Sequence, residues 1–193
     1  MAKSSRENEI KLAFPSPESA LRKLLAAGAR PLLDRAFEDN VLYDFEDGAL
    51  RSSGRLLRLR LVRGSALLTL KAEIPGEHRH KLRAEHETEV RDADALREIL
   101  SGLGLAPVYR YQKYRTTFRL PAVEASLDET PLGTFVELEG PPDSVDAAAR
   151  RLGASDGEFI RATYRDLQER DAEVRGTVAG DLLMPRPETH DPA

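Results

Sequence analysis

Strict two-residue alternation recurs along this chain, and it constrains the fold more than any other feature. In the segment "SRENEIKLAF", Glu7, Glu9 and Lys11 fall on one side of an extended chain, while Ile10 and Leu12 fall on the other. Such alternation predicts a β-strand with one apolar face and one charged face. The charged face is either wetted by solvent, as in an ordinary sheet, or it lines a site.

Several later segments repeat the pattern, and most of them carry charges of a single sign on the polar face. Grouped by segment, the charged positions are Arg58 and Arg60; Lys71; Arg83, Glu85 and Glu87; Lys113 and Arg115; and Glu137 and Glu139. Any one of these segments alone is typical of a half-wetted strand. About eight such strands form a sheet long enough to curl or close on itself. If the sheet closes with its apolar face outward beneath helices, the charges line a tunnel.

Helix signals separate the expected strands. The sequence predicts helices over residues 16–29, 92–104, 142–153 and 157–174, with Ser16 as the N-cap of the first, and it predicts a hairpin turn at Arg63–Ser65. The fold class is therefore α+β, a closed, mostly antiparallel eight-stranded β-barrel with helices packed outside. Residues 1–175 are expected to form a single domain, and residues 176–193 a flexible C-terminal tail without hydrophobic periodicity.

Composition excludes several functional classes. The net charge of −4 gives no bulk attraction to nucleic acid or to anionic lipid, so we expect neither a DNA partner nor a membrane partner. The chain contains no cysteine, which excludes disulfides and thiolate metal sites. No window approaches the roughly 20 apolar residues of a membrane span. We therefore expect a cytoplasmic protein whose anion site is a local concentration of basic residues.

The two sets of charges predict the chemistry of the ligand. Arginine and lysine side chains facing one tunnel suit a ligand with several negative charges in a row, and planar guanidinium groups fit phosphate oxygens bidentately. Carboxylates do not bind phosphate directly, but clustered on facing strands they hold hard divalent cations, with Mg²⁺ or Mn²⁺ the natural partners of a phosphate chain. A linear triphosphate bound together with a metal ion satisfies both sets.

At this point the sequence resembles a known family. Glu7-x-Glu9-x-Lys11 near the N-terminus is the hallmark of the CYTH superfamily, which includes class IV adenylate cyclases, thiamine triphosphatases and inorganic triphosphatases. The segments "LRLR", "TLK", "RAEHE", "KYR", "SLDETPLGTFVELEG" and "TYRDL" follow in the order typical of the family. The resemblance spans about residues 7–168 and is specific because seven motifs occur in order.

The resemblance implies a triphosphate tunnel and assigns roles to its lining. The residues expected to bind phosphate are Lys11, Arg58, Arg60, Lys71, Arg83 and Arg115; those expected to hold one or two Mg²⁺ or Mn²⁺ ions are Glu7, Glu9, Glu85, Glu87, Asp128, Glu137 and Glu139. In some family members a lysine at the position of Lys113 activates the attacking group, sometimes through a tyrosine on the strand after the first helix. Tyr43 is the nearest candidate, although a one-residue slip in register would turn it out of the tunnel.

Three functions remain open. The favoured one is a triphosphatase that hydrolyses the terminal phosphate of tripolyphosphate, thiamine triphosphate or another triphosphate. The alternative is an adenylate cyclase that converts ATP to cyclic AMP and pyrophosphate in a similar tunnel. The third is a module that binds polyphosphate or triphosphate-ended RNA without turnover, although phosphate binding alone does not require the acidic positions. The resembled family also commonly forms homodimers.

The histidines are not expected to take part in the site. His78 and His80 have the spacing of metal ligands, but they lie in a charged segment and are interpreted as surface residues. His86 alternates with Glu85 and Glu87, so it should face away from the tunnel.

Overall fold

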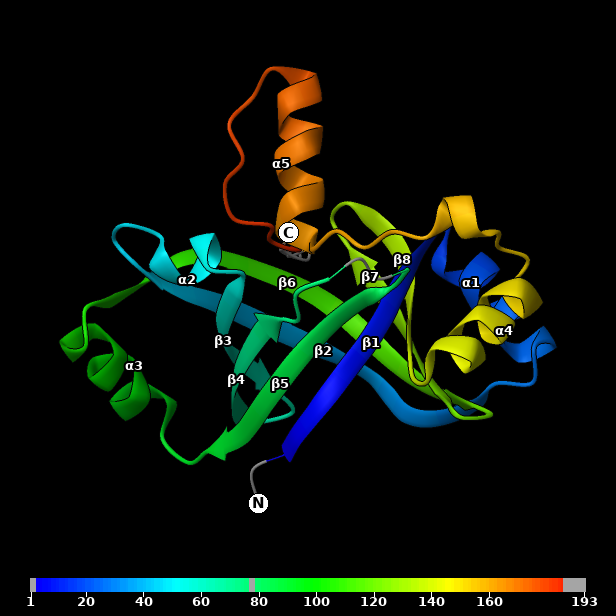
Figure 1. Ribbon diagram of the computed structural model, residues 1–193, viewed down its shortest axis with the longest axis horizontal. Helices are drawn as coiled ribbons and strands as arrows, with labels where there is room; N and C mark the ends of the chain where they lie inside the picture. The colour runs from blue at the N-terminus through cyan, green and yellow to red at the C-terminus, as the bar shows by residue number, and fades with distance from the viewer. Residues whose placement is uncertain (1–2, 77–78, 186–193) are drawn as a thin grey trace, which may run out of the picture.

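The computed structural model describes residues 3–76 and 79–185, and their strands form a closed barrel (Figure 1). The strands are β1 (Lys3–Phe14), β2 (Arg30–Phe45), β3 (Arg55–Val62), β4 (Ser65–Glu73), β5 (Lys81–Val90), β6 (Leu105–Leu120), β7 (Val123–Thr130) and β8 (Gly133–Glu139). Around the barrel they follow the order β1-β5-β4-β3-β2-β6-β7-β8, and every pairing is antiparallel. The expected barrel is confirmed.

Helices cover the outside of the barrel. They are α1 (Pro17–Ala26), α2 (Ala49–Ser52), α3 (Ala93–Gly102), α4 (Pro142–Leu152) and α5 (Tyr164–Arg175), with a short 3₁₀ turn at Asp156–Glu158. Ser16 caps α1 by accepting a hydrogen bond from the backbone of Ser19, as its sequence position predicts. Figure 1 shows α1 and α4 side by side on one flank, α3 on the opposite flank, and α5 standing over one end.

The apolar faces of the strands point outward and are buried under these helices. Ile10 and Leu12 of β1 pack with Leu24 of α1 and Val145 of α4 in the largest core cluster. A second cluster lies between the strands and α3, and a third lies between one end of the barrel and α5. Because the hydrophobic core is external to the barrel, the charged faces of the same strands are left to line its interior.

The predicted hairpin turn at Arg63–Ser65 is confirmed. The β3–β4 hairpin turns at Arg63 and Gly64, whose φ angles of 52° and 78° are both positive, the requirement of a type I′ turn. The link 46–54 contains α2, whose backbone N–H groups at Leu50 and Arg51 donate to the carboxylate of Asp44.

The segment 157–174 differs from the single helix expected there. Its first part is extended: the backbone N–H groups of Lys11 and Ile160 each donate to the other's carbonyl, both at 2.9 Å. The helix α5 then begins at Tyr164, because Thr163 accepts from the backbone of Asp166 while the Asp166 side chain accepts from the backbone of Thr163. This capping box fixes a helix start inside the expected element.

The described part of the expected flexible tail contacts the barrel. After Gly176 ends α5, the chain returns to the barrel, and the backbone of Leu182 pairs with β6, with bonds of 2.8 Å to both Arg110 and Gln112. The Leu182 side chain is buried against Leu42 and Tyr109. A single leucine and one short stretch of pairing carry no periodic signal, so no sequence pattern predicts this contact.

The described helices include none that combines the length and the apolar character needed to cross a membrane.

Candidate active site

A cavity of about 220 Å³ lies inside the barrel, and inward-facing charged side chains make up most of its wall. Of the fifteen residues that the sequence assigned to the site, thirteen line this cavity: Glu7, Glu9, Lys11, Arg58, Arg60, Lys71, Arg83, Glu85, Glu87, Lys113, Arg115, Glu137 and Glu139. They come from six strands whose alternation turns the same parity of residue inward. Asp128 and Tyr43 are the two exceptions.

Basic and acidic side chains alternate across neighbouring strands. Lys71 Nζ lies 2.6 Å from Glu7 Oε1 and 3.5 Å from Glu85 Oε1. Glu9 accepts from Lys81 at 2.9 Å and from Lys11 at 3.3 Å. All of these groups are largely withdrawn from solvent, and buried charges of this density require mutual pairing or a compensating ligand.

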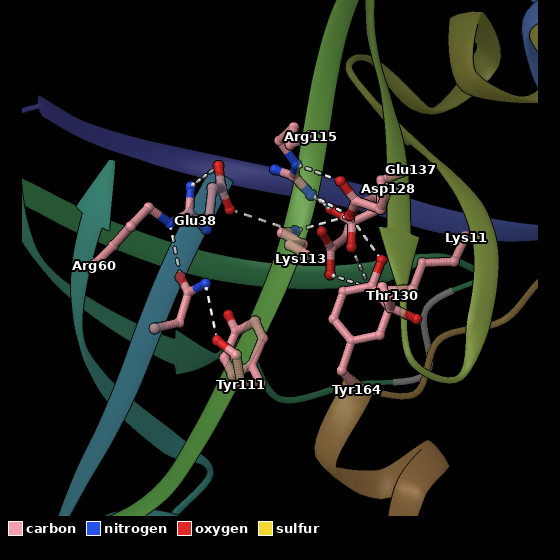
Figure 2. A network of polar contacts seen from close by, with 12 residues as sticks. Lys11, Glu38, Arg60, Tyr111, Lys113, Arg115, Asp128, Thr130, Glu137 and Tyr164 are labelled. Atoms are coloured by element: carbon pink, nitrogen blue, oxygen red, sulfur yellow. Dashed lines mark hydrogen bonds and ion pairs between the residues drawn. The ribbon is translucent and has the colours of Figure 1, made fainter. Parts of the chain in front are cut away.

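Asp128 lies behind the cavity wall and holds two of the cations in place (Figure 2). Its Oδ2 accepts from Lys113 Nζ at 2.8 Å and from Arg115 Nη2 at 2.6 Å, and its Oδ1 accepts from Arg115 Nε at 2.6 Å. The hydroxyl of Tyr164 donates to the same Oδ2 at 2.7 Å. With four donors on a fully buried carboxylate, the contacts of Asp128 are those of a positioning residue, and it does not line the cavity beside the other expected metal ligands.

Glu38 was not predicted as a site residue, although it lies at the centre of this network of hydrogen bonds and ion pairs. It is buried, accepts from Arg60 at 3.2 Å and lies 3.7 Å from Lys113 Nζ. Burial alone raises the pKa of Glu38, but Arg60, Lys113 and other cations outweigh it and lower the pKa to about 2. The two-residue alternation of strands could have indicated this position, since Glu38, Asn40 and Leu42 share one face of the segment "EDNVL".

Lys81 and Tyr111 also line the cavity and were not predicted from the sequence. Lys81 begins the alternating run that continues through Arg83, and burial lowers its pKa to about 8 despite the neighbouring Glu9. Tyr111 faces the same cavity from β6. Burial raises the pKa of Tyr111, but the cations Arg58 and Lys113 outweigh burial and lower it to about 8.

The acidic residues form a cluster with excess negative charge at one side of the cavity. Burial, and then repulsion from Glu7 and Glu85, raise the pKa of Glu139 to about 7. Burial and Glu9 raise the pKa of Glu7, whose Oε2 is buried without a hydrogen-bond partner among the described residues. Carboxylate oxygens held in this way are suited to a hard divalent cation.

The carboxylates do not form a complete metal cage. No group of three or more acidic or histidine side chains in ranges 3–76 and 79–185 meets the geometry of a metal site. Mg²⁺ commonly takes only one or two protein carboxylates and completes its shell with phosphate oxygens and water. The donor set therefore fits a metal ion that binds together with a phosphorylated ligand.

Tyr43 lies on the outer face of β2, so its expected position in the tunnel is wrong. It packs with Leu59 and Leu100 in the core cluster beneath α3, while the adjacent Leu42 faces the cavity. Strand alternation is the reason, since a shift of one residue exchanges the two faces.

His80 also differs from its expected place on the surface. The side chain is buried, its Nε2 lies 2.8 Å from Asp146 Oδ1, and its Nδ1 contacts the side chain of Asn8. Its ring joins β1 to α4 outside the barrel, so its role is structural. His78 lies outside the described residues, and His86 is exposed on the outer face as expected.

Comparisons with known proteins agree with this architecture. A family model described as the CYTH domain matches residues 5–173. A provisionally named adenylate cyclase of Methanocaldococcus jannaschii is 25% identical over 173 residues, covering 84% of this chain and 98% of that protein.

Solved structures share the fold at low sequence identity. A Pyrococcus horikoshii protein has a TM-score of 0.72 at 24% identity, covering 86% of this chain and 99% of its own. A provisionally named adenylate cyclase from Vibrio parahaemolyticus has a TM-score of 0.71 at 18% identity, covering 86% and 98%. A provisionally named adenylyl cyclase from Hippeastrum, described as having a dominant triphosphatase activity, has a TM-score of 0.58 at 19% identity, covering 89% and 97%.

Proposed function

Since this chain belongs to the CYTH domain family, we propose that it is a metal-dependent enzyme that hydrolyses the terminal phosphate of triphosphate compounds. The observation that carries this proposal is the pairing of two charge sets around one cavity. Basic side chains enter from β1, β3, β4, β5 and β6, and a carboxylate cluster enters from β1, β5 and β8. A triphosphate accompanied by a divalent cation satisfies both sets, whereas a neutral ligand satisfies neither.

The basic residues are proposed to bind the phosphate chain. Arg58 and Arg83 have buried Nε atoms without a hydrogen-bond partner among the described residues. Such donors are costly to leave unsatisfied, and phosphate oxygens are suitable acceptors. Lys11, Arg60, Lys71 and Arg115 are proposed to bind further oxygens along the chain.

The acidic residues are proposed to hold one or two Mg²⁺ or Mn²⁺ ions. The proposed ligands are Glu7, Glu9, Glu85, Glu87, Glu137 and Glu139. When bound, such an ion would neutralise phosphate charge and act as a Lewis acid toward the reacting groups.

Lys113 is proposed as the principal catalytic side chain of the protein. Its stem is buried, and its ammonium lies between Glu38 at 3.7 Å and Asp128 at 2.8 Å. A cation fixed in this way requires little rearrangement to stabilise charge developing on a phosphate oxygen. Glu38 and Asp128 would orient it without touching the substrate.

An adenylate cyclase is the second candidate, and the apolar side chains Leu42 and Leu56 in the cavity wall favour it because a cyclase must accommodate adenosine. The name of the M. jannaschii relative is a further point in its favour. A binding module without turnover is a third candidate, which the orphaned carboxylate oxygen of Glu7 makes less favourable.

Product analysis separates these functions. Purified protein with Mg²⁺ or Mn²⁺ is given tripolyphosphate or ATP at neutral to alkaline pH. Release of orthophosphate supports the triphosphatase. Cyclic AMP with stoichiometric pyrophosphate identifies the cyclase instead, and tight metal-dependent binding without product leaves the binding module.

A further inference from the structure

Thr69 occupies an inward position of β4 but does not line the tunnel cavity. It shares one face of the strand with Lys71, which does reach the cavity, while Thr69 itself is fully buried. Across the sheet, Thr69 pairs with Arg58 of β3 on one side and with Glu87 of β5 on the other. Both neighbours line the cavity, so one neutral hydroxyl lies between a member of the basic set and a member of the acidic set.

The Thr69 hydroxyl connects these two charged groups through a directed pair of hydrogen bonds. Its Oγ1 accepts from Arg58 Nη2 at 3.1 Å and donates to Glu87 Oε2 at 2.8 Å. The direct distance from Arg58 Nη2 to Glu87 Oε2 is 3.6 Å, which is too long for a hydrogen bond. The guanidinium and the carboxylate are therefore bridged by the threonine and do not donate to or accept from each other.

Other cations of the tunnel contact carboxylates directly. Lys71 Nζ lies 2.6 Å from Glu7 Oε1, and Arg60 Nη1 lies 3.2 Å from Glu38 Oε1. A direct contact of this kind occupies a donor and an acceptor that a ligand could otherwise use. Arg58, in contrast, retains a buried Nε without a hydrogen-bond partner among the described residues. Its guanidinium is thus held in place while part of it stays available to an anion.

Resting on the function proposed above, we propose that Thr69 is a positioning residue that keeps Arg58 and Glu87 from closing into a direct ion pair. Without the hydroxyl, each charged group loses a hydrogen bond, and the gap of 3.6 Å lets the two groups close on each other. The resulting pair would consume a donor for the phosphate chain and an acceptor for the metal ion. Thr69 therefore serves the binding of both ligands without touching either.

Two separate titrations test this role without depending on turnover. Tripolyphosphate is titrated into the full chain in the presence of EDTA, and Mn²⁺ is titrated into the full chain without phosphate, each followed by calorimetry. Thr69→Val replaces the hydroxyl with a methyl group, and we expect both dissociation constants to rise about tenfold, the effect of losing one hydrogen bond to a charged group. Thr69→Ser retains a hydroxyl and should restore the binding of both ligands. Thr88→Val, at an exposed residue of β5, is the matched control.

A double variant separates this role from a merely structural one. Glu87→Gln removes the negative charge that would capture Arg58. In the Glu87→Gln background, Thr69→Val should therefore lose most of its effect on the binding of tripolyphosphate in EDTA. An equal effect of Thr69→Val in both backgrounds would make Thr69 a structural residue and overturn the proposal.

The remaining outcomes also decide the matter. Unchanged binding of both ligands by Thr69→Val would overturn the proposal, and a loss confined to one ligand would contradict a role that serves both. If Thr69→Val does not fold, Thr69→Ala carries the same comparison, and failure of both variants to fold would show a structural role instead. Failure of the unmodified chain to bind either ligand would overturn the proposed function itself.

Discussion

The hydroxyl of Tyr164, in the first turn of α5, donates to Oδ2 of Asp128 on β7 at 2.7 Å. The same oxygen accepts from Lys113 and from Arg115. A helix outside the barrel therefore supplies one of the groups that orient the buried carboxylate behind the tunnel (Figure 2). Through Asp128, the position of α5 is coupled to the two cations that face the proposed phosphate site.

Removal of this hydroxyl should impair turnover more than substrate binding. For Tyr164→Phe we expect kcat to fall about tenfold, the typical effect of losing one hydrogen bond to a charged group, with KM changed less than threefold. Steady-state kinetics with the preferred triphosphate measures both constants. Tyr114→Phe, on the outer face of β6, is the control. An unchanged kcat would show that Asp128 does not need Tyr164.

Lys71 should be required for activity but not for folding. Lys71→Met retains most of the side chain but removes the ammonium next to Glu7, and we expect kcat/KM to fall about a hundredfold or more. The melting temperature, measured by differential scanning fluorimetry, should stay within a few degrees. Lys23→Met on the exposed face of α1 is the matched control. An unfolded Lys71→Met would favour a structural role for the charged lining.

Tyr111 should ionise at a lower pH than Tyr109 and Tyr164. Cations near its hydroxyl lower its pKa to about 8, whereas the pKa values of Tyr109 and Tyr164 are raised. Because the lowered pKa belongs to the folded state, this tyrosine stabilises the fold above the unfolded-state pKa, and the contribution is lost as pH falls through 8.

Tyrosinate absorbance during a pH titration checks this value. One tyrosine should titrate near pH 8, and that step should be absent from Tyr111→Phe. Tripolyphosphate should raise the pKa, since its negative charge offsets the cations that lower it. A titration step that tripolyphosphate leaves in place would mean that the phosphate chain binds away from Tyr111.

Divalent cations should stabilise the protein through the glutamate cluster. Mn²⁺ at saturating concentration is expected to raise the melting temperature by several degrees, because a ligand that binds only the folded state stabilises it. Glu7→Gln should reduce that shift strongly. Glu73→Gln, at a residue whose side chain is 63% exposed, should retain it. Equal shifts in both variants would place the metal outside the cluster.

Leu182 should contribute to stability despite its location near the end of the described chain. Leu182→Ala removes a buried side chain and is expected to lower the free energy of unfolding by about 2 kcal/mol. The neighbouring Leu183 is 44% exposed, and Leu183→Ala should cost less than about 0.5 kcal/mol. Urea denaturation measures both, and equal effects would contradict the docking of this segment on β6.

Most of the prediction of which residues face the barrel interior follows from strand alternation. It assigned Glu7, Arg58 and Lys113 to one surface, because a two-residue period decides which face each side chain occupies. The position of Tyr43 shows the limit of that reasoning: when the register is uncertain by one residue, periodicity cannot say which of Leu42 and Tyr43 faces inward.

Contacts between distant segments could not be predicted. The burial of His80 depends on Asp146, and the role of Asp128 depends on Tyr164; neither partner is near in sequence. Such pairs arise only when helices dock on the barrel, and a single sequence contains no local pattern that records the docking. The family resemblance therefore suggested a metal role for Asp128, and the charged local segment suggested a surface position for His80.

The pairing of Ile160 with β1 and of Leu182 with β6 has a consequence for biosynthesis. These two contacts flank α5 and hold it over the end of the barrel (Figure 1). During translation, a nascent chain that stops before residue 160 contains every strand of the barrel but lacks the segment that carries Tyr164. Such a chain would lack the hydrogen bond from Tyr164 to Asp128, so full activity should emerge only after α5 has left the ribosome.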